Sequence, residues 1–310
     1  MAELAGVMVG NYFLLECLTR QGIVETYRAR PTTQGGYDVV LRLFRPQFPD
    51  PAGFSEHFAS EVEKLWRCRH PYVQPLLEFG TGDDLLYTAT LLTETETLQK
   101  FLARQRGRFL PIPLVVRLIA QVCAALQYIH EQGMIHGNVQ PSSILVLNEE
   151  DILLTNFSMK HAYQDGAPLG APVEEENAAY TAPEQALGII QPASDIYAVG
   201  LLLYQLLTDR LPYEIERRDE DMLSHSNEPV RTSGITRPEL PEAVETVVRI
   251  ALAKNPADRF PDAASLAQAL LAAFVSDEQR VVPDVPLRRI SVYARRTSFT
   301  WARAAWLLSN

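Results

Sequence analysis

The spacing of the apolar residues changes once along the chain, near Leu92, and this change restricts the folds that the chain can adopt. Before it, β-prone runs predict strands over residues 12–18, 26–29, 37–44, 76–79 and 85–92. A single helical pattern interrupts these runs at 54–66. After it, apolar residues recur at helical spacing over 114–129, 196–207 and 263–274. We therefore expect an α+β fold in which a small β-rich lobe precedes a larger helical lobe.

The same pattern divides the chain into four segments. They are an N-terminal extension (1–10), the β-rich lobe (11–92), the helical lobe (93–275) and a basic aromatic tail (276–310). Local signals mark two helix ends: Gly133 is expected to end the helix over 114–129, and Ser194 to begin the next helix as its N-cap. Because 196–207 is apolar on every side, that helix should lie in the centre of its lobe.

Charge and cysteine content argue against several classes of protein. The formal net charge is −10, so we expect no nucleic-acid partner. Cys17, Cys68 and Cys123 lie far apart, which indicates reduced thiols of a cytoplasmic protein and neither disulfides nor a zinc site. The first residues contain an acid and no basic region, which predicts no signal peptide. No apolar run reaches the roughly 18 residues of a membrane span, so no transmembrane segment is expected.

Several motifs, in order and at suitable spacing, resemble those of the eukaryotic-type protein kinases, and in particular the bacterial Ser/Thr kinases. The matching segments are 58–71 (a helix with its His-Pro exit), 136–145 (catalytic loop), 155–158 (Asp-Phe-Gly turn), 181–188 (Ala-Pro-Glu motif), 194–213 (central helix) and 255–260 (late Arg). The resemblance covers about residues 10–275. It implies the bilobal protein-kinase fold, with a β-rich N-lobe and a helical C-lobe.

The resemblance assigns roles to positions, and the residues at the charged positions differ from those that phosphoryl transfer from ATP requires. The catalytic Asp is replaced by Asn138, whose amide cannot accept the proton of a hydroxyl as a carboxylate does. The neighbouring Lys is Gln140, and the two magnesium-binding positions hold the neutral Ser143 and Asn156. Because Mg²⁺ depends on carboxylate oxygens, we expect no metal site and no catalytic residues.

Positions that handle phosphate elsewhere in the resemblance are altered as well. The three glycine positions of the phosphate-binding loop hold Thr19, Gln21 and Val24, so an ordinary β-hairpin is expected there. The Arg that normally precedes the catalytic position is Gly137, which removes the usual receiver of an activation-loop phosphate. The acidic run 174–176 adds negative charge near the substrate shelf.

Arg42 stands at the position of the phosphate-binding Lys, in the third strand of the resemblance. A planar guanidinium does not replace a compact ammonium, and we expect Arg42 to form a bidentate pair with Glu61 that fixes the helix without a ligand. Val40, Thr90 and Leu145 are expected to line the remnant of a nucleotide cleft with these two residues. No cofactor is expected there, and ATP bound without metal is the alternative.

Residues that the resemblance assigns to the scaffold are kept. Glu184 and Arg259 are expected to form a buried pair that ties the activation segment to the helical lobe. Asp195 is expected to orient the backbone of the catalytic loop, and His136 to pack and donate hydrogen bonds rather than act as a base. Kept scaffold residues together with lost charged residues predict a pseudokinase, a kinase-like domain without transferase chemistry.

The predicted role is that of a scaffold or allosteric regulator in Ser/Thr kinase signalling, with an active Ser/Thr kinase as the candidate protein partner. The alternative is a protein Ser/Thr kinase with residual or unorthodox ATP-dependent phosphotransfer. That alternative needs Glu61, or a Glu of the run 174–176, as a displaced metal ligand or base.

The tail carries six Arg against three acids, a net charge of +3. Two units in it read Arg-Arg-x-Ser-apolar, which makes Ser291 and Ser298 candidate phosphorylation sites. Three interpretations stay open: a basic arm that packs on its own acidic domain, phosphorylation by an active partner kinase, and contact with an anionic membrane surface through Trp301 and Trp306.

Overall fold

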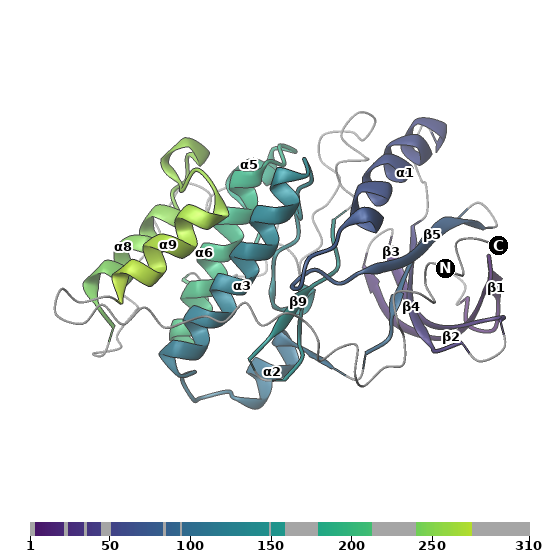
Figure 1. Cartoon of the computed structure of the whole chain (residues 1–310), viewed down its shortest axis with the longest axis horizontal. Helices are drawn as coiled ribbons and strands as arrows, with labels where there is room; N and C mark the ends of the chain where they lie inside the picture. The colour runs from purple at the N-terminus through teal and green to yellow at the C-terminus, as the bar shows by residue number, and fades with distance from the viewer. Residues whose placement is uncertain are drawn as a thin grey trace.

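The computed structural model describes residues 4–21, 24–33, 36–44, 51–82, 85–93, 95–148, 150–158, 179–212 and 240–274. It shows a β-rich lobe beside a helical lobe (Figure 1), so the expected α+β fold is confirmed. The predicted tail, 276–310, and the acidic run, 174–176, lie outside the described residues.

The β-rich lobe is built on an antiparallel six-stranded sheet in the order β1-β2-β3-β4-β6-β5. The strands are β1 (Met8–Val9), β2 (Tyr12–Gln21), β3 (Val24–Pro31), β4 (Val39–Phe44), β5 (Leu76–Gly82) and β6 (Leu85–Leu91). Side chains alternate along β4, where Val39, Leu41 and Leu43 are buried in the interior of the lobe. Val40 and Arg42 are half-buried on the opposite face, so the strand period places these two residues side by side.

Helix α1 (Pro51–Arg67) covers one face of this sheet (Figure 1). Its buried residues Phe58, Val62 and Leu65 recur at helical spacing. The ring of Phe58 lies 5.0 Å from that of Phe44 on β4, measured between ring centroids. This aromatic contact ties the helix to the strand that carries Arg42.

The helical lobe holds α2 (Leu98–Arg104), α3 (Ile112–Glu131), α5 (Pro183–Ala186), α6 (Pro192–Thr208), α8 (Glu242–Ala251) and α9 (Ala263–Ala273), and the short helices η1 (Pro141–Ser143) and η4 (Pro256–Asp258). A small antiparallel sheet of β7 (Glu96–Thr97), β8 (Ile144–Val146) and β9 (Ile152–Leu154) lies where the lobes meet. Helix α6 is buried on nearly every side, which confirms the prediction for 196–207.

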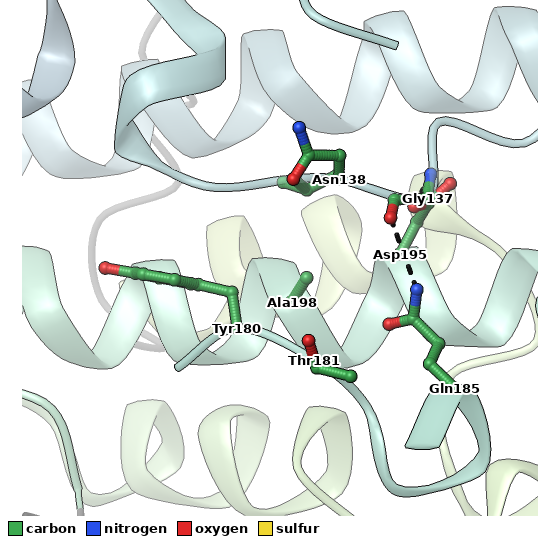
Figure 2. A pocket seen from close by; sticks show the side chains of 8 residues that line it. Gly137, Asn138, Tyr180, Thr181, Gln185, Asp195 and Ala198 are labelled. Atoms are coloured by element: carbon green, nitrogen blue, oxygen red, sulfur yellow. Dashed lines mark hydrogen bonds between the residues drawn. The ribbon is translucent and has the colours of Figure 1, made fainter. Parts of the chain in front are cut away.

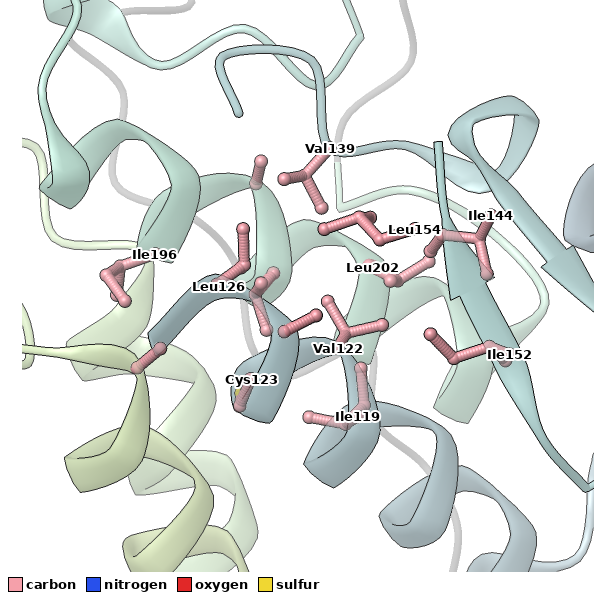
Figure 3. Packing of buried hydrophobic residues seen from close by; sticks show 14 of the residues in the cluster. Ile119, Val122, Cys123, Leu126, Val139, Ile144, Ile152, Leu154, Ile196 and Leu202 are labelled. Atoms are coloured by element: carbon pink, nitrogen blue, oxygen red, sulfur yellow. The ribbon is translucent and has the colours of Figure 1, made fainter. Parts of the chain in front are cut away.

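The core of the helical lobe joins α3, α6 and the small sheet. Figure 3 shows Ile119 and Val122 of α3 among side chains from α6, such as Leu202, and from β8 and β9. At Gly200 of α6 a β-carbon would stand only 2.8 Å from the side chain of Ala251, so α6 and α8 approach closely there. This core holds in place the helices and strands from which the segments 136–143 and 155–158 of the candidate site extend.

By length and composition, α3 is the one helix among the described residues that could cross a membrane. Of the 18-residue apolar window in this helix, 56% is buried inside the lobe. A central core helix meets the same criterion, so this result is weak support for a membrane span.

The two predicted helix ends had different outcomes. Gly133 follows α3 with a φ of 69°, and the Gly133 and Met134 amides donate back to the carbonyls of His130 and Ile129, both at 3.0 Å, as in a Schellman motif. Ser194 is not an N-cap, because α6 begins two residues earlier at Pro192, whose fixed φ suits a first helical position. Ser194 therefore lies in the first turn of α6.

Candidate functional site

The candidate site lies between two segments that run side by side: the loop 136–143 and residues 155–158, which follow β9. Two backbone hydrogen bonds join them. The amide of Thr155 donates to the carbonyl of Ser143, and the amide of Ser158 donates to the carbonyl of His136, both at 2.9 Å. The two segments therefore form one unit.

The side chain of Asn138 is the centre of this unit. Its Oδ1 accepts a hydrogen bond from Nε2 of Gln140 at 2.7 Å. Its Nδ2 donates to Oγ of Ser143 and to the carbonyl oxygen of Asn156, both at 3.2 Å. The structure thus brings together the four positions that the resemblance assigned to the catalytic base, the adjacent Lys and the two metal ligands, and every group in these contacts is neutral. We call Asn138, Gln140, Ser143 and Asn156 the neutral network.

The backbone turns sharply on both sides of the neutral network. Asn156 has a φ of 57°, a left-handed conformation that Asn tolerates better than most residues, and its Nδ2 donates to the carbonyl of Ser142 at 3.2 Å. Gly137 has a φ of 67°, and a β-carbon there would stand 3.2 Å from the β-carbon of Ser158. The glycine at 137 therefore suits the space and the backbone that it occupies.

Asp195, in the first turn of α6, holds the start of the loop. Its Oδ1 accepts from the amide of Gly137 at 2.8 Å, and its Oδ2 accepts from the amide of His136 at 2.9 Å. His130 Nε2, which sequence reasoning did not single out, lies 2.8 Å from the same Oδ2. The position of His130, six residues before His136 at the end of the α3 pattern, was the available signal. Asp195 is 1% exposed, and its buried charge is met by these donors.

His136 joins the two segments through its ring. Nε2 lies 2.9 Å from the carbonyl oxygen of Thr155, and Nδ1 accepts from the amide of Asn138 at 3.2 Å. This pattern assigns the proton to Nε2 of a neutral imidazole. Burial lowers the pKa of His136 from its ordinary value to about 4, so the ring is uncharged at neutral pH. The ring also packs against Phe157.

The expected bidentate pair between Arg42 and Glu61 is wrong. In the described part of the chain, each of the two side chains has a different partner. Nη1 of Arg42 donates to the carbonyl of Phe157 at 3.0 Å, and its guanidinium lies 5.2 Å from the centroid of the Phe44 ring. Oε1 of Glu61 accepts from Nζ of Lys64, three residues along the same helix, at 2.5 Å. The neighbouring cation on α1 thus provides the local partner for Glu61.

The remaining residues of the expected nucleotide cleft lie on strands. Val40 and Thr90 are paired across β4 and β6, and Leu145 lies on β8 opposite Leu153. All three expected cleft residues are half-buried. The structure therefore leaves Val40 and Thr90 beside Arg42 on one sheet face, at the lobe boundary.

The strands that would carry the phosphate-binding glycines, β2 and β3, pair antiparallel, with register shifts between Leu14 and Glu16 and between Cys17 and Thr19. The pairing of β2 with β3 continues to its last residues, with Thr19 opposite Thr26 and Gln21 opposite Val24. The backbone is therefore paired at the three positions to which the resemblance assigns glycine, and the freedom of a glycine-rich loop to fold over phosphate is not available there.

Glu184 of α5 and Arg259, next to η4, form a bidentate ion pair at 2.6 and 2.8 Å. Arg259 also donates to three backbone carbonyls, and Ser194 Oγ donates to Glu184 at 2.7 Å. Burial alone would raise the pKa of Glu184, but the hydrogen bonds from Arg259 and Ser194 outweigh it, and the pKa is lowered. This pair joins α5 to the base of the helical lobe.

A small pocket lies between the loop and the segment that leads into α5 (Figure 2). Its lining residues come from the loop, from that segment, from α5 and from α6: Gly137, Asn138, Val139, Tyr180, Thr181, Gln185, Asp195 and Ala198. Nε2 of Gln185 donates across the pocket to the carbonyl of Gly137 at 3.3 Å. The one carboxylate in the lining is Asp195, which already accepts hydrogen bonds from the loop.

Within the described ranges, no group of three or more His, Cys, Asp or Glu side chains is placed to hold a metal ion. Ser291 and Ser298, the candidate phosphorylation sites, lie outside the described residues.

Comparison with known proteins identifies the family. A model of the protein kinase domain matches residues 46–273. The kinase PknH of Mycobacterium bovis is 31% identical over 287 residues, which are 92% of this chain and 47% of PknH. The kinase PknD of Mycobacterium tuberculosis is 31% identical over 288 residues, 92% of this chain and 42% of PknD. The chain therefore spans about half the length of the curated relatives that it matches.

The structural comparison agrees with the sequence comparison. The crystal structure of the PknI kinase domain of Mycobacterium tuberculosis superposes with a TM-score of 0.66 at 24% identity, covering 88% of this chain and 100% of that one. The family match begins after β4, and so leaves out Thr19, Val24 and Arg42. With a family model that covers most of its length and Ser/Thr-protein kinases of bacteria as its relatives, the chain belongs to the protein kinase family.

Proposed function

We propose that this kinase domain is a pseudokinase, which binds and regulates other proteins and does not transfer phosphate. The observation that carries the proposal is the neutral network, in which four positions that handle charge in the family hold amides and a hydroxyl. Phosphoryl transfer depends on neutralising the triphosphate and on a base for the hydroxyl proton. Neutral groups that already bond to one another provide neither.

Two further contacts support the loss of metal-dependent nucleotide binding. Arg42 donates to the carbonyl of Phe157, so part of its guanidinium is used within the protein. The hairpin of β2 and β3 is paired through the positions of the missing glycines. A triphosphate with Mg²⁺ would meet no carboxylate in the neutral network, and hard cations bind neutral oxygens weakly.

The scaffold that a regulatory role needs is intact. Asp195 and His136 fix the loop, and Glu184 with Arg259 fixes α5, all without a ligand. In this proposal the domain binds an active Ser/Thr kinase as its partner in the cytoplasm, where the buried free thiols of Cys68 and Cys123 stay reduced. The tail adds Ser291 and Ser298 as sites at which that partner phosphorylates it, beside the alternatives of packing on its own domain or touching a membrane.

Thermal melts with ATP test the proposal directly. A ligand that binds only the folded state raises Tm, by an amount that grows with the ratio of ligand concentration to Kd. We expect millimolar ATP with Mg²⁺ to leave the Tm of this protein unchanged, whereas the Ser/Thr-protein kinase PknD, as the comparison protein, should be stabilised under the same conditions. ATP alone serves as the second arm, because a rise in Tm without metal identifies nucleotide bound in a metal-independent way.

A metal-dependent rise in Tm, together with transfer of labelled phosphate to a generic substrate, would overturn the proposal. That result would favour the alternative, a Ser/Thr kinase with residual or unorthodox phosphotransfer. Glu61 is the described carboxylate on which this alternative depends, and its partner is Lys64, on the surface of α1. The variant Glu61→Ala should then lose the transferred label while keeping the Tm of the parent.

A further inference from the structure

A group of exposed cations lies at one edge of the helical lobe, away from the neutral network. Lys100 and Arg104 lie one helical turn apart on α2, and Arg106 and Arg108 follow in the turn that leads to α3. Arg210, after the end of α6, is the fifth. All five side chains belong to exposed residues, and the turn between α2 and α3 lies at the lower edge of the molecule in Figure 1. We call these five residues the basic edge.

The fold itself brings the basic edge together from two distant parts of the sequence. The amide of Gly107 donates to Oδ2 of Asp209 at 3.0 Å, across 102 positions of the chain. Gly107 has a φ of 79° and Asp209, at the C-cap of α6, a φ of 58°. This contact fixes the turn carrying Arg106 and Arg108 beside the residue that precedes Arg210.

Nearby acids offset only part of this charge. Glu96 forms an ion pair with Arg104, and Asp209 accepts from the Gly107 amide. Among the residues that the structure describes, the other four cations of the basic edge form no ion pair. Two exposed arginines elsewhere in the described ranges do form ion pairs, Arg30 with Asp38 and Arg67 with Glu63, whereas the isolated Arg249 on α8 forms none. The edge is therefore locally positive on a chain whose net charge is −10.

An aromatic residue continues this surface. Phe109 directly follows Arg108 and is 57% exposed. Cations next to an exposed Phe ring are a combination that binds at the interface of an anionic bilayer, where the cations attract the headgroups and the apolar ring inserts at the boundary between headgroups and acyl chains. A purely acidic surface with no apolar layer beneath it would bind the cations and leave the ring exposed to water, whereas a bilayer takes up both. We infer that the basic edge binds a membrane surface of anionic phospholipid.

Co-sedimentation of the full chain with lipid vesicles tests this inference. We expect binding to vesicles that contain phosphatidylglycerol, none to vesicles of phosphatidylcholine alone, and weaker binding as salt screens the charges. The double variant R106E/R108E should lower the partition coefficient by more than about tenfold, because each cation near a charged bilayer contributes separately.

A matched control carries the same change in net charge elsewhere. The variant R67E/R249E reverses two exposed arginines on α1 and α8, and should bind nearly as well as the parent chain. Equal losses in the two double variants, or an unchanged partition coefficient in R106E/R108E, would overturn the inference and leave the basic tail as the source of any binding.

A third outcome also decides the question. Binding to soluble polyglutamate, with none to anionic vesicles, would identify an acidic protein as the partner and exclude the lipid surface. None of these measurements involves ATP or the neutral network, so their outcome is independent of the proposed loss of catalysis. Equal Tm values for both double variants and the parent would show that each is folded.

Discussion

At the scale of single residues, the neutral network assigns a direction to every hydrogen bond of Asn138. Its amide oxygen accepts from Gln140, while its amide nitrogen donates to Ser143 and to the carbonyl of Asn156. A carboxylate has acceptors only. The network therefore depends on the amide, and an Asp at this position would place a carboxylate oxygen against the carbonyl of Asn156.

The variant Asn138→Asp is expected to be less stable than the parent and still inactive. It loses the donated bonds and places a charged oxygen against the Asn156 carbonyl, which costs on the order of 1–3 kcal/mol. Thermal melts and a labelled-ATP assay measure the two effects. Asn11→Asp, at an exposed position, is the control and should leave Tm unchanged. Phosphotransfer by Asn138→Asp would contradict our account of the neutral network.

Sequence reasoning identified the members of this network but not its geometry. Asn138, Gln140, Ser143 and Asn156 were found one by one from the resemblance, yet nothing in their order along the chain predicts that they bond to one another. The expected pair of Arg42 with Glu61 fails for a related reason. Motifs carry over residue types, whereas Lys64, one turn along α1, competes for Glu61 locally.

At the scale of elements, Arg259 acts as a brace between three parts of the helical lobe. Its guanidinium contacts Glu184 on α5, the carbonyl of Ala193 at the start of α6, and the carbonyl of Ala253 after α8. It also lies 4.9 Å from the centroid of the Tyr197 ring. Because both charges are buried, each depends on the other for compensation.

Replacing one partner of this pair should therefore be costly. Glu184→Gln leaves the Arg259 guanidinium buried beside a neutral amide, and we expect the free energy of unfolding to fall by about 3 kcal/mol. Urea unfolding monitored by circular dichroism measures this change. Glu150→Gln removes an exposed partner of Arg117 and should cost less than about 1 kcal/mol. Similar losses in the two variants would show that the buried pair is not the brace we describe.

Helical periodicity predicted α3, α6 and α9, because each buries a continuous apolar face. It did not predict the N-terminus of α6, where Pro192 determines the start and Ser194 turns to Glu184. It also missed the basic edge, since the contact between Gly107 and Asp209 depends on how the core places α2 and α6. Local sequence patterns therefore predict the helices, whereas a surface such as the basic edge depends on how the helices pack.

At the scale of the whole molecule, two polar side chains near the candidate site hold the two lobes together. Arg42 of the β-rich lobe donates to the carbonyl of Phe157 in the helical lobe. Gln74 adds a second tie, because its Nε2 donates to the Leu91 carbonyl at 3.3 Å and its Oε1 accepts from Thr155. Polar groups near the candidate site are thus used to maintain one arrangement of the lobes.

The burial of His136 links this arrangement to pH. Burial lowers its pKa to about 4 in the folded protein, against about 6.5 in an unfolded chain. As the pH falls from 6.5 toward 4, the unfolded chain takes up a proton that the folded chain excludes, so stability decreases throughout that window. Burial also lowers the pKa of His70, which adds to the loss in the same direction. The Glu184 contribution is lost only at lower pH, because its pKa is depressed below the ordinary carboxyl value.

We therefore expect the free energy of unfolding of the parent chain to fall by about 2 kcal/mol or more between pH 7 and pH 5, as measured with urea. The variant His136→Gln is expected to be less stable at pH 7, because it loses the ring that packs against Phe157, but its stability should change less over this interval. His57→Gln, at an exposed position on α1, should keep the parent's pH dependence. A His136→Gln variant with the parent's full dependence on pH would place the titrating group elsewhere. If the pH dependence of stability is reduced in His136→Gln, the buried imidazole that joins Thr155 to Asn138 in the candidate site also limits the stability of the whole domain in mild acid.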